Sequence, residues 1–225
     1  MSAAPLVFER VALAELNGDG MSLEVPAHQT VIVLGADHSG VDALGGYALA
    51  LPAPPTGRVL VFDVDLARLP SRERRAARRR VGYLPAGDGL LHNLTLRDNI
   101  ALPLRFGSDL SDAEIESRVG ITCSMLRITR VADRRPAAVG EQERRRAALA
   151  RALAFDPELV IMESPFDGLT ARTAAEFLEL ARGGETGAGS RRTVFMTSQY
   201  LPSRLAPRIE LRYRVERGTF TTEES

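Results

Sequence analysis

The stretch Gly35-Ala36-Asp37-His38-Ser39-Gly40-Val41-Asp42 decides how this sequence folds. An apolar run at residues 31–34 precedes it, and a run of small residues at 41–51 follows it. A strand, a glycine-flanked loop and a helix in this order form the context of the phosphate-binding frame G-x-x-x-x-G-Lys-Ser/Thr. Val41 and Asp42 stand where that frame has its lysine and its hydroxyl residue. The alternative is a strand-to-helix turn that needs glycine only for its backbone.

The two exchanged residues change the charge of the loop. In a complete frame, backbone amides and the helix N-terminus cradle phosphates, the lysine reaches the terminal phosphates, and the hydroxyl holds magnesium. One charge pair at about 4 Å is worth roughly 4 kcal/mol at an effective dielectric constant near 20. Losing an ammonium and gaining the Asp42 carboxylate therefore replaces attraction to a polyanion by repulsion. We expect weak or absent nucleotide binding and no bound cofactor.

Composition favours one compact domain over residues 1–225, since 225 residues with 44% hydrophobic content can build a continuous core. Basic and acidic residues balance at 29 each, so no global field attracts nucleic acid or an anionic membrane. The single Cys123 and the absence of a leader pattern predict a cytoplasmic setting. Because no apolar run approaches roughly 20 residues, we expect another subunit to hold the chain at any membrane.

Strand and helix patterns alternate along the chain, which predicts an α/β sheet with crossover connections. Short β-branched runs predict strands at 6–11, 22–25, 30–34, 58–62, 81–84, 159–162, 193–197, 209–215 and 219–221. Helical patterns occupy 41–51, 71–80, 143–155 and 171–182. Ser111 and Glu114 form a capping box that predicts the start of another helix.

Four further stretches have recognisable patterns: Pro-Thr-Gly-Arg-Val at 55–59, Arg-Val-Gly-Tyr-Leu-Pro at 80–85, the segment 90–104 and Asp-Pro-Glu at 156–158. With these stretches, the chain resembles the ABC ATPase family from Leu6 to Phe220. The segment 90–104 is similar to branches that serve lipid trafficking, lipoprotein release and cell division. The resemblance implies a P-loop NTPase (RecA-like) α/β core with an antiparallel β subdomain and an inserted α-helical subdomain at about 88–152.

The resemblance also implies catalytic positions, and this sequence departs from the family at each of them. Ala86 stands in place of the glutamine that senses magnesium, Ser164 in place of the general-base glutamate, and Ser198 in place of the switch histidine. Glu163 takes the place of the magnesium-linked aspartate. A neutral hydroxyl cannot orient and deprotonate water as a carboxylate can.

The signature of the family, Leu-Ser-Gly-Gly followed by Gln or Glu, is changed as well. An ungapped alignment places Val139, Gly140, Glu141 and Gln142 there, followed by Glu143. A gapped alignment keeps Gly140-Glu141-Gln142 in register, but the serine and one glycine are still missing. Because composite sites combine one chain's phosphate loop with its partner's signature, both contributions are changed. We predict a chain that is not an enzyme, a pseudo-ATPase.

The segment 90–104, the best-matching part of the chain, lies near the family's groove for a transmembrane partner. We predict a cassette that docks on a permease, on an intact ABC ATPase subunit or on both, peripheral at the inner face of the membrane. It would pair as a homodimer or a heterodimer. The alternative for this segment is that it persists because it packs the core.

A second hypothesis is an ATP-binding transporter subunit with unusual ligands, in which a divalent ion lies between Asp42 and Glu163. Two unpaired surface carboxylates are the simpler interpretation, so these residues are weak metal candidates. His38 and His92 have no second histidine or cysteine at ligand spacing, so we predict no metal site there. The arginine runs within 72–80 and at 144–146 lack interleaved aromatic residues, so no nucleic acid partner is predicted.

Overall fold

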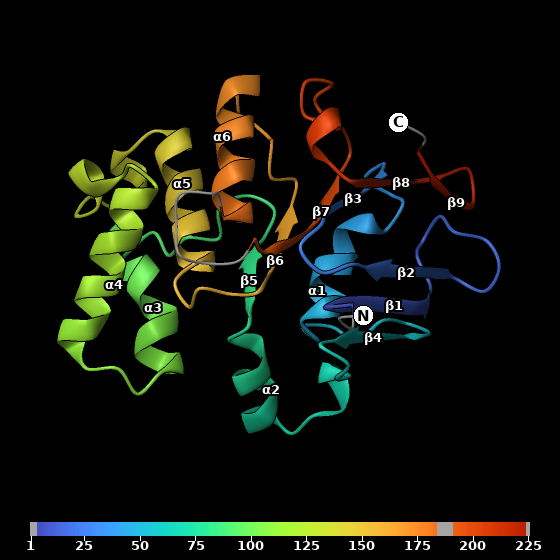
Figure 1. The fold of residues 1–225 in the computed structure, drawn as a ribbon, viewed down its shortest axis with the longest axis horizontal. Helices are drawn as coiled ribbons and strands as arrows, with labels where there is room; N and C mark the ends of the chain where they lie inside the picture. Colours follow the sequence, from blue (N-terminus) through green and yellow to red (C-terminus); the bar gives the residue numbers. More distant parts are fainter. Residues whose placement is uncertain (1–3, 184–190, 224–225) are drawn as a thin grey trace.

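A computed structural model describes residues 4–183 and 191–223 as a mixed α/β structure with two sheets (Figure 1). The strands are β1 (Leu6–Val11), β2 (Met21–Val25), β3 (Thr30–Gly35), β4 (Arg58–Val61), β5 (Val81–Leu84), β6 (Leu159–Glu163), β7 (Thr193–Ser198), β8 (Leu211–Glu216) and β9 (Thr219–Thr222). The α-helices are α1 (Leu44–Ala48), α2 (Ser71–Arg78), α3 (Leu96–Gly107), α4 (Asp112–Met125), α5 (Glu141–Ala152) and α6 (Ala171–Arg182). Short 3-10 helices are η1 (Val41–Ala43), η2 (Leu66–Arg68), η3 (Thr129–Val131), η4 (Pro136–Ala138) and η5 (Ala206–Arg208).

The larger sheet has the strand order β5-β6-β7-β3-β8-β9, parallel except for the β8–β9 hairpin. Every residue of β3, β6 and β7 is buried, as expected for parallel strands covered on both faces. Successive side chains alternate between the two faces. Ile32 and Leu34 pack with the cluster that contains α3 to α6, whereas Val31 and Val33 pack with the cluster that contains α1.

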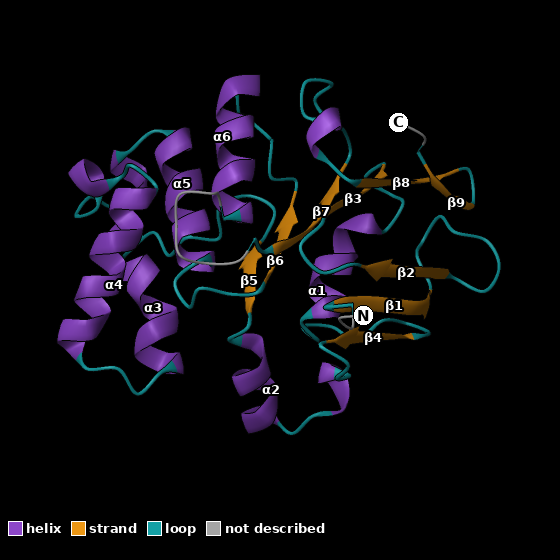
Figure 2. Cartoon of the chain, viewed as in Figure 1, coloured by secondary structure: helices purple, strands orange, loops and turns teal. Residues whose placement is uncertain are grey.

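The smaller sheet is antiparallel, with the order β2-β1-β4. Its inward residues pack against the α1 side of the larger sheet; Phe8 and Phe195, for example, have ring centroids 5.3 Å apart. Figure 2 shows the two layers beside each other. The predicted α/β core with an antiparallel layer is therefore confirmed.

The helices α3, α4 and α5 lie together at one end of the molecule (Figure 1). The predicted capping box is present at the start of α4, where Ser111 and Glu114 bond each other's backbone. Among the described residues, no helix is long and apolar enough to cross a membrane.

Three predicted helices have different bounds in the structure, and the one expected at 71–80 ends at Arg78. The helix expected at 41–51 is only η1 followed by the short α1, because Gly45 and Gly46 are poor helix formers and Leu51 already bonds back to the Gly46 carbonyl. The helix expected at 143–155 begins at Glu141, because the Glu143 carboxylate caps the backbone amide of Gly140.

Candidate functional site

Four sequence-predicted positions meet at one edge of the larger sheet. The loop 35–42 follows β3, Ala86 follows β5, Ser164 follows β6 and Ser198 ends β7. These strands are parallel neighbours in the order β5-β6-β7-β3, so their carboxyl ends share an edge. In open α/β sheets, ligands bind outside this edge.

The backbone of the loop turns at a left-handed glycine just before the helical segment that follows. Gly40 has φ 85°, in the left-handed region, and precedes η1. The interior of the turn, however, is filled by the loop's own side chains. Ser39 is buried, and its hydroxyl donates to the Ala36 carbonyl at 2.6 Å and accepts from the Val41 amide at 3.4 Å. A Cβ atom added at Gly35 would lie 2.8 Å from Cγ1 of Val41.

The exposed side chains of the loop offer no ammonium group. Asp37 accepts a hydrogen bond from the amide of Gln199, and Nε2 of His38 lies 3.7 Å from the Glu15 carboxylate. The Asp42 side chain is exposed at the start of η1. The sequence contains no lysine at all, since all 29 Lys+Arg residues are arginine. This chain therefore cannot supply the lysine of the frame from anywhere else.

Glu163, at the end of β6, is engaged with the protein itself. Its carboxylate accepts hydrogen bonds from the Tyr83 hydroxyl at 2.7 Å and from the Ala86 amide at 3.1 Å. Burial, together with the bond to Glu163, raises the pKa of Tyr83 far above its ordinary value. No group of three or more metal-ligating side chains is found in the described part of the chain. The side chains at this edge therefore do not fit magnesium triphosphate in the usual way.

The two serines form part of the backbone structure at this edge of the sheet. Ser164 has φ 43°, and its amide donates to the Thr197 carbonyl at 2.7 Å, which joins β6 to β7. Ser198 is 3% exposed, and its hydroxyl accepts from the Tyr200 amide at 3.4 Å. Ser198 therefore ends the strand next to β3, and Ser164 follows the strand one position further along the same edge.

The predicted signature residues lie elsewhere, at the start of α5. Val139 precedes the helix, Gly140 caps it, and Glu141 and Gln142 are exposed in its first turn. The Glu141 carboxylate lies against Gly168, in the loop after β6. These residues are therefore separate from the strand-edge positions described above.

Sequence reasoning missed the arginines that hold the loop after β5. Arg145 donates to the Gly87 carbonyl at 3.0 Å, Arg151 donates to the carbonyls of Asp88 and Gly89, and Arg144 pairs with Asp88 at 3.2 Å. The run 144–146 was considered only as a possible nucleic-acid contact, because a sequence does not show which carbonyls a helix will meet. Arg145 is in fact 6% exposed.

Comparisons with known proteins identify the relatives of this chain. Residues 19–167 match the family described as ABC transporter. The chain is 35% identical to the methionine import ATP-binding protein MetN 1 of Yersinia pestis bv. Antiqua (strain Antiqua), over 72% of this chain and 47% of the relative. It is 30% identical to the molybdate/tungstate import ATP-binding protein WtpC of Pyrococcus abyssi, over 70% of this chain and 44% of that relative. The chain thus spans about half the length of the curated relatives it matches.

Solved structures confirm the P-loop NTPase fold. The dimeric ATP-binding cassette MJ0796, bound to ADP and Pi, has a TM-score of 0.83 with this chain and covers 98% of it. The match also covers 99% of that cassette. At 20% sequence identity, this likeness establishes the fold alone.

The comparisons contradict one prediction and leave two others unsupported. The prediction of a chain that is not an enzyme, a pseudo-ATPase, is contradicted, because the relatives are named ATP-binding proteins and such transporter subunits are ATPases. The expectation of no cofactor is not supported, because the family uses ATP and Mg²⁺. A lipid link is not supported either, since these relatives are named for methionine and molybdate or tungstate import.

Proposed function

Because the chain belongs to the ABC transporter family, whose ATP-binding subunits work with transmembrane permeases and dimerise, we propose that it is such a subunit. In this proposal it docks on a permease at the cytoplasmic face of the membrane and pairs with a second cassette, identical or different. It binds nucleotide through ligands other than the ammonium and hydroxyl of the usual frame. Its contribution to the complex includes scaffolding or regulation of the partner.

The observation that carries this proposal is the loop 35–42 at the carboxyl edge of the parallel strands. Its left-handed Gly40 and the following η1 support the proposal, because a glycine turn that leads into a helix is the usual backbone setting of a phosphate site. Phosphate contacts would then come from backbone amides rather than from a lysine, and they would be weaker for that reason.

A rigid segment next to this edge supports the docking part of the proposal. The loop 86–89 is bonded to Glu163 on one side and to the arginines of α5 on the other. Asn99 then fixes Leu91, whose amide donates to the Asn99 side chain at 2.7 Å. The Leu91 side chain is 48% exposed, so an apolar contact is presented on a fixed backbone.

Co-purification with the candidate permease tests the docking. The permease is to be coexpressed with the full chain, and Leu91→Asp is compared with Leu51→Asp, because both leucines are exposed, at 48% and 57%. We expect Leu91→Asp to lose the permease and Leu51→Asp to retain it. Retention by both variants would refute a docking surface at Leu91, and failure of the unaltered chain to recover a permease or a cassette would refute the proposal.

A further inference from the structure

A groove with a volume of about 1220 Å³ runs along α6, away from the nucleotide edge. Residues on one face of α6 line it, from Arg172 through Glu176 to Leu180 and on to Gly183. Eleven helical steps of 1.5 Å give the groove a length of roughly 17 Å. The segments 156–158 and 191–193 line it too, and they lead into β6 and β7. The groove therefore lies at the amino ends of the parallel strands, opposite the loop 35–42.

The described residues that line the groove carry a net positive charge. They include seven arginines and five carboxylates, whereas basic and acidic residues balance over the whole sequence. Two positive charges are thus concentrated in the groove. Such a surplus attracts acidic partners and speeds their association.

Much of the surplus lies at the end of the groove near the start of α6. The single Glu176 carboxylate faces Arg146 at 3.0 Å, Arg172 at 3.6 Å and Arg127 at 4.0 Å. The side chains of Arg127 and Arg172 are 76% and 91% exposed. These two guanidinium groups are held near one shared carboxylate and remain open to an incoming acid.

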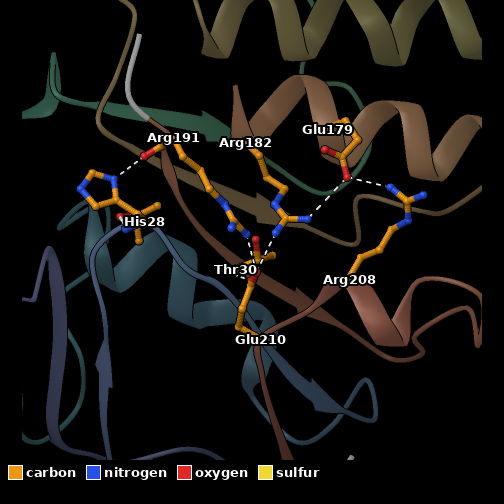
Figure 3. A network of polar contacts seen from close by, with 8 residues as sticks. His28, Thr30, Glu179, Arg182, Arg191, Arg208 and Glu210 are labelled. Atoms are coloured by element: carbon orange, nitrogen blue, oxygen red, sulfur yellow. Dashed lines mark hydrogen bonds and ion pairs between the residues drawn. The ribbon is translucent and has the colours of Figure 1, made fainter. Parts of the chain in front are cut away.

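The opposite end of the groove repeats this arrangement (Figure 3). Arg182 and Arg191 share the Glu210 carboxylate, which also accepts from the Thr30 amide, while Arg182 and Arg208 share Glu179. Three guanidinium groups share two carboxylates here, and of these residues Arg191, Arg208 and Glu179 line the groove.

Arg192 adds an independent sign of a missing partner at this end. One of its terminal nitrogens donates to Asp156 at 2.5 Å. Its Nε atom is buried and has no hydrogen-bond partner among the described residues. A buried donor without an acceptor is unfavourable, so the Arg192 side chain gains a hydrogen bond if it turns toward an acceptor in the groove.

Apolar side chains lie between these two basic ends. Leu180 and Ala175 are half-buried on α6, and Met125 is 40% exposed at the end of α4. We propose that the groove docks an extended acidic peptide segment of a partner protein, with apolar residues between its acidic ends. About five extended residues span 17 Å at 3.3 Å each. Guanidinium groups bind carboxylates through paired hydrogen bonds, which fits this occupant.

Fluorescence anisotropy of a labelled Asp-Glu-Leu-Leu-Glu-Asp peptide, titrated with the full chain, tests the proposal. We expect saturable binding that weakens at least about tenfold in the double variant Arg127→Glu, Arg172→Glu. The matched control is Arg72→Glu with Arg75→Glu, which makes the same charge change on exposed positions of α2 outside the groove. This control is expected to bind within about twofold of the unaltered chain.

Three results would overturn the proposal. The first is an absence of saturable binding, and the second is equal weakening in the control, which would indicate attraction by net charge alone. The third is displacement of the peptide by free citrate or phosphate at the peptide's own concentration, which would indicate a small-anion site. A peptide with serines in place of the leucines is expected to bind more weakly. Because the assay contains neither nucleotide nor permease, its outcome is independent of the proposed transporter role.

Discussion

The Glu163 carboxylate accepts a hydrogen bond from the backbone amide of Ala86, with an Oε2–N distance of 3.1 Å. Glu163 ends β6, and Ala86 lies in the loop after the neighbouring β5. The other carboxylate oxygen accepts from the Tyr83 hydroxyl at 2.7 Å. Hydrogen bonds to the Glu163 carboxylate therefore join the strand edge to the loop that leads toward α3.

The first prediction concerns this bond. Tyr83→Phe removes one donor from a carboxylate whose residue is only 8% exposed, so we expect the free energy of unfolding to fall by about 1–2 kcal/mol. Urea unfolding of the purified chain measures the change. Tyr47→Phe is the matched control, because the described contacts give its hydroxyl no hydrogen bond, and its unfolding should hardly change. Equal losses in both variants would mean that the Tyr83 bond contributes nothing specific.

The second prediction concerns the phosphate loop. Val41→Lys with Asp42→Thr completes the G-x-x-x-x-G-Lys-Thr frame. We expect at least about tenfold tighter binding of labelled ATP with Mg²⁺, because an ammonium replaces a repelling carboxylate. Asp42→Asn alone removes the repulsion without adding the ammonium, so it should bring a smaller gain.

Equilibrium titrations with and without Mg²⁺ measure these affinities. Gly40→Asp places a carboxylate at the left-handed residue of the loop and should abolish the binding that the unaltered chain has. If the completed frame binds no more tightly than the unaltered chain, the loop is not the phosphate site.

Local patterns in the sequence predicted most of the fold. The strand predicted at 22–25, the glycine-flanked loop after β3 and the capping box of Ser111 and Glu114 each depend on neighbouring residues, and each is present. Resemblance predicted the cassette architecture. These signals agree because local preference and tertiary packing favour the same structure.

The contacts that define the candidate site depend on tertiary pairing, and the sequence did not reveal them. The bond from Tyr83 to Glu163 requires that β5 lie next to β6, and the buried position of Arg145 requires that α5 lie against the loop after β5. The changed residues at 41 and 42 were visible in the sequence. The prediction drawn from them, that the chain is not an enzyme, is contradicted by the relatives, which are named ATP-binding proteins.

The third prediction is a pH dependence that arises at the start of α3. The hydrogen bond from the Thr95 hydroxyl, followed by the interaction with Arg105, holds the pKa of Asp98 below its ordinary value of 3.8. A carboxyl group with a depressed folded-state pKa stabilises the fold above its unfolded-state pKa, and this contribution is lost as the pH falls through the folded-state pKa. Asp98→Asn should therefore lower the stability at pH 6, and the difference should shrink below about pH 4.

Urea unfolding across this pH range measures the effect. Asp109→Asn is the control, because Asp109 is exposed and has no ion pair among the described contacts. Its difference from the unaltered chain should stay small at every pH. A pH-independent loss in Asp98→Asn would indicate that the carboxylate acts through packing rather than through its charge.

The fourth prediction concerns Asn99, a fully buried side chain in α3. Its carbonyl oxygen accepts from the Leu91 amide at 2.7 Å, and its amide donates to the carbonyls of Leu91 and Thr95 at 3.0 and 2.8 Å. Asn99→Ala leaves the part-buried Leu91 amide without this partner and removes one donor from each of the two carbonyls, so we expect a loss of about 1–3 kcal/mol in the free energy of unfolding.

The exposed Asn93 lies in the same segment and provides the matched control, since Asn93→Ala removes a side chain with no described hydrogen bond. Hydrogen exchange separates local loosening from global destabilisation. In Asn99→Ala the Leu91 amide should exchange faster relative to the amides of β3, which lies in the larger sheet. If the Leu91 amide and the β3 amides accelerate equally, Asn99 stabilises the whole fold and does not specifically fix the proposed docking segment.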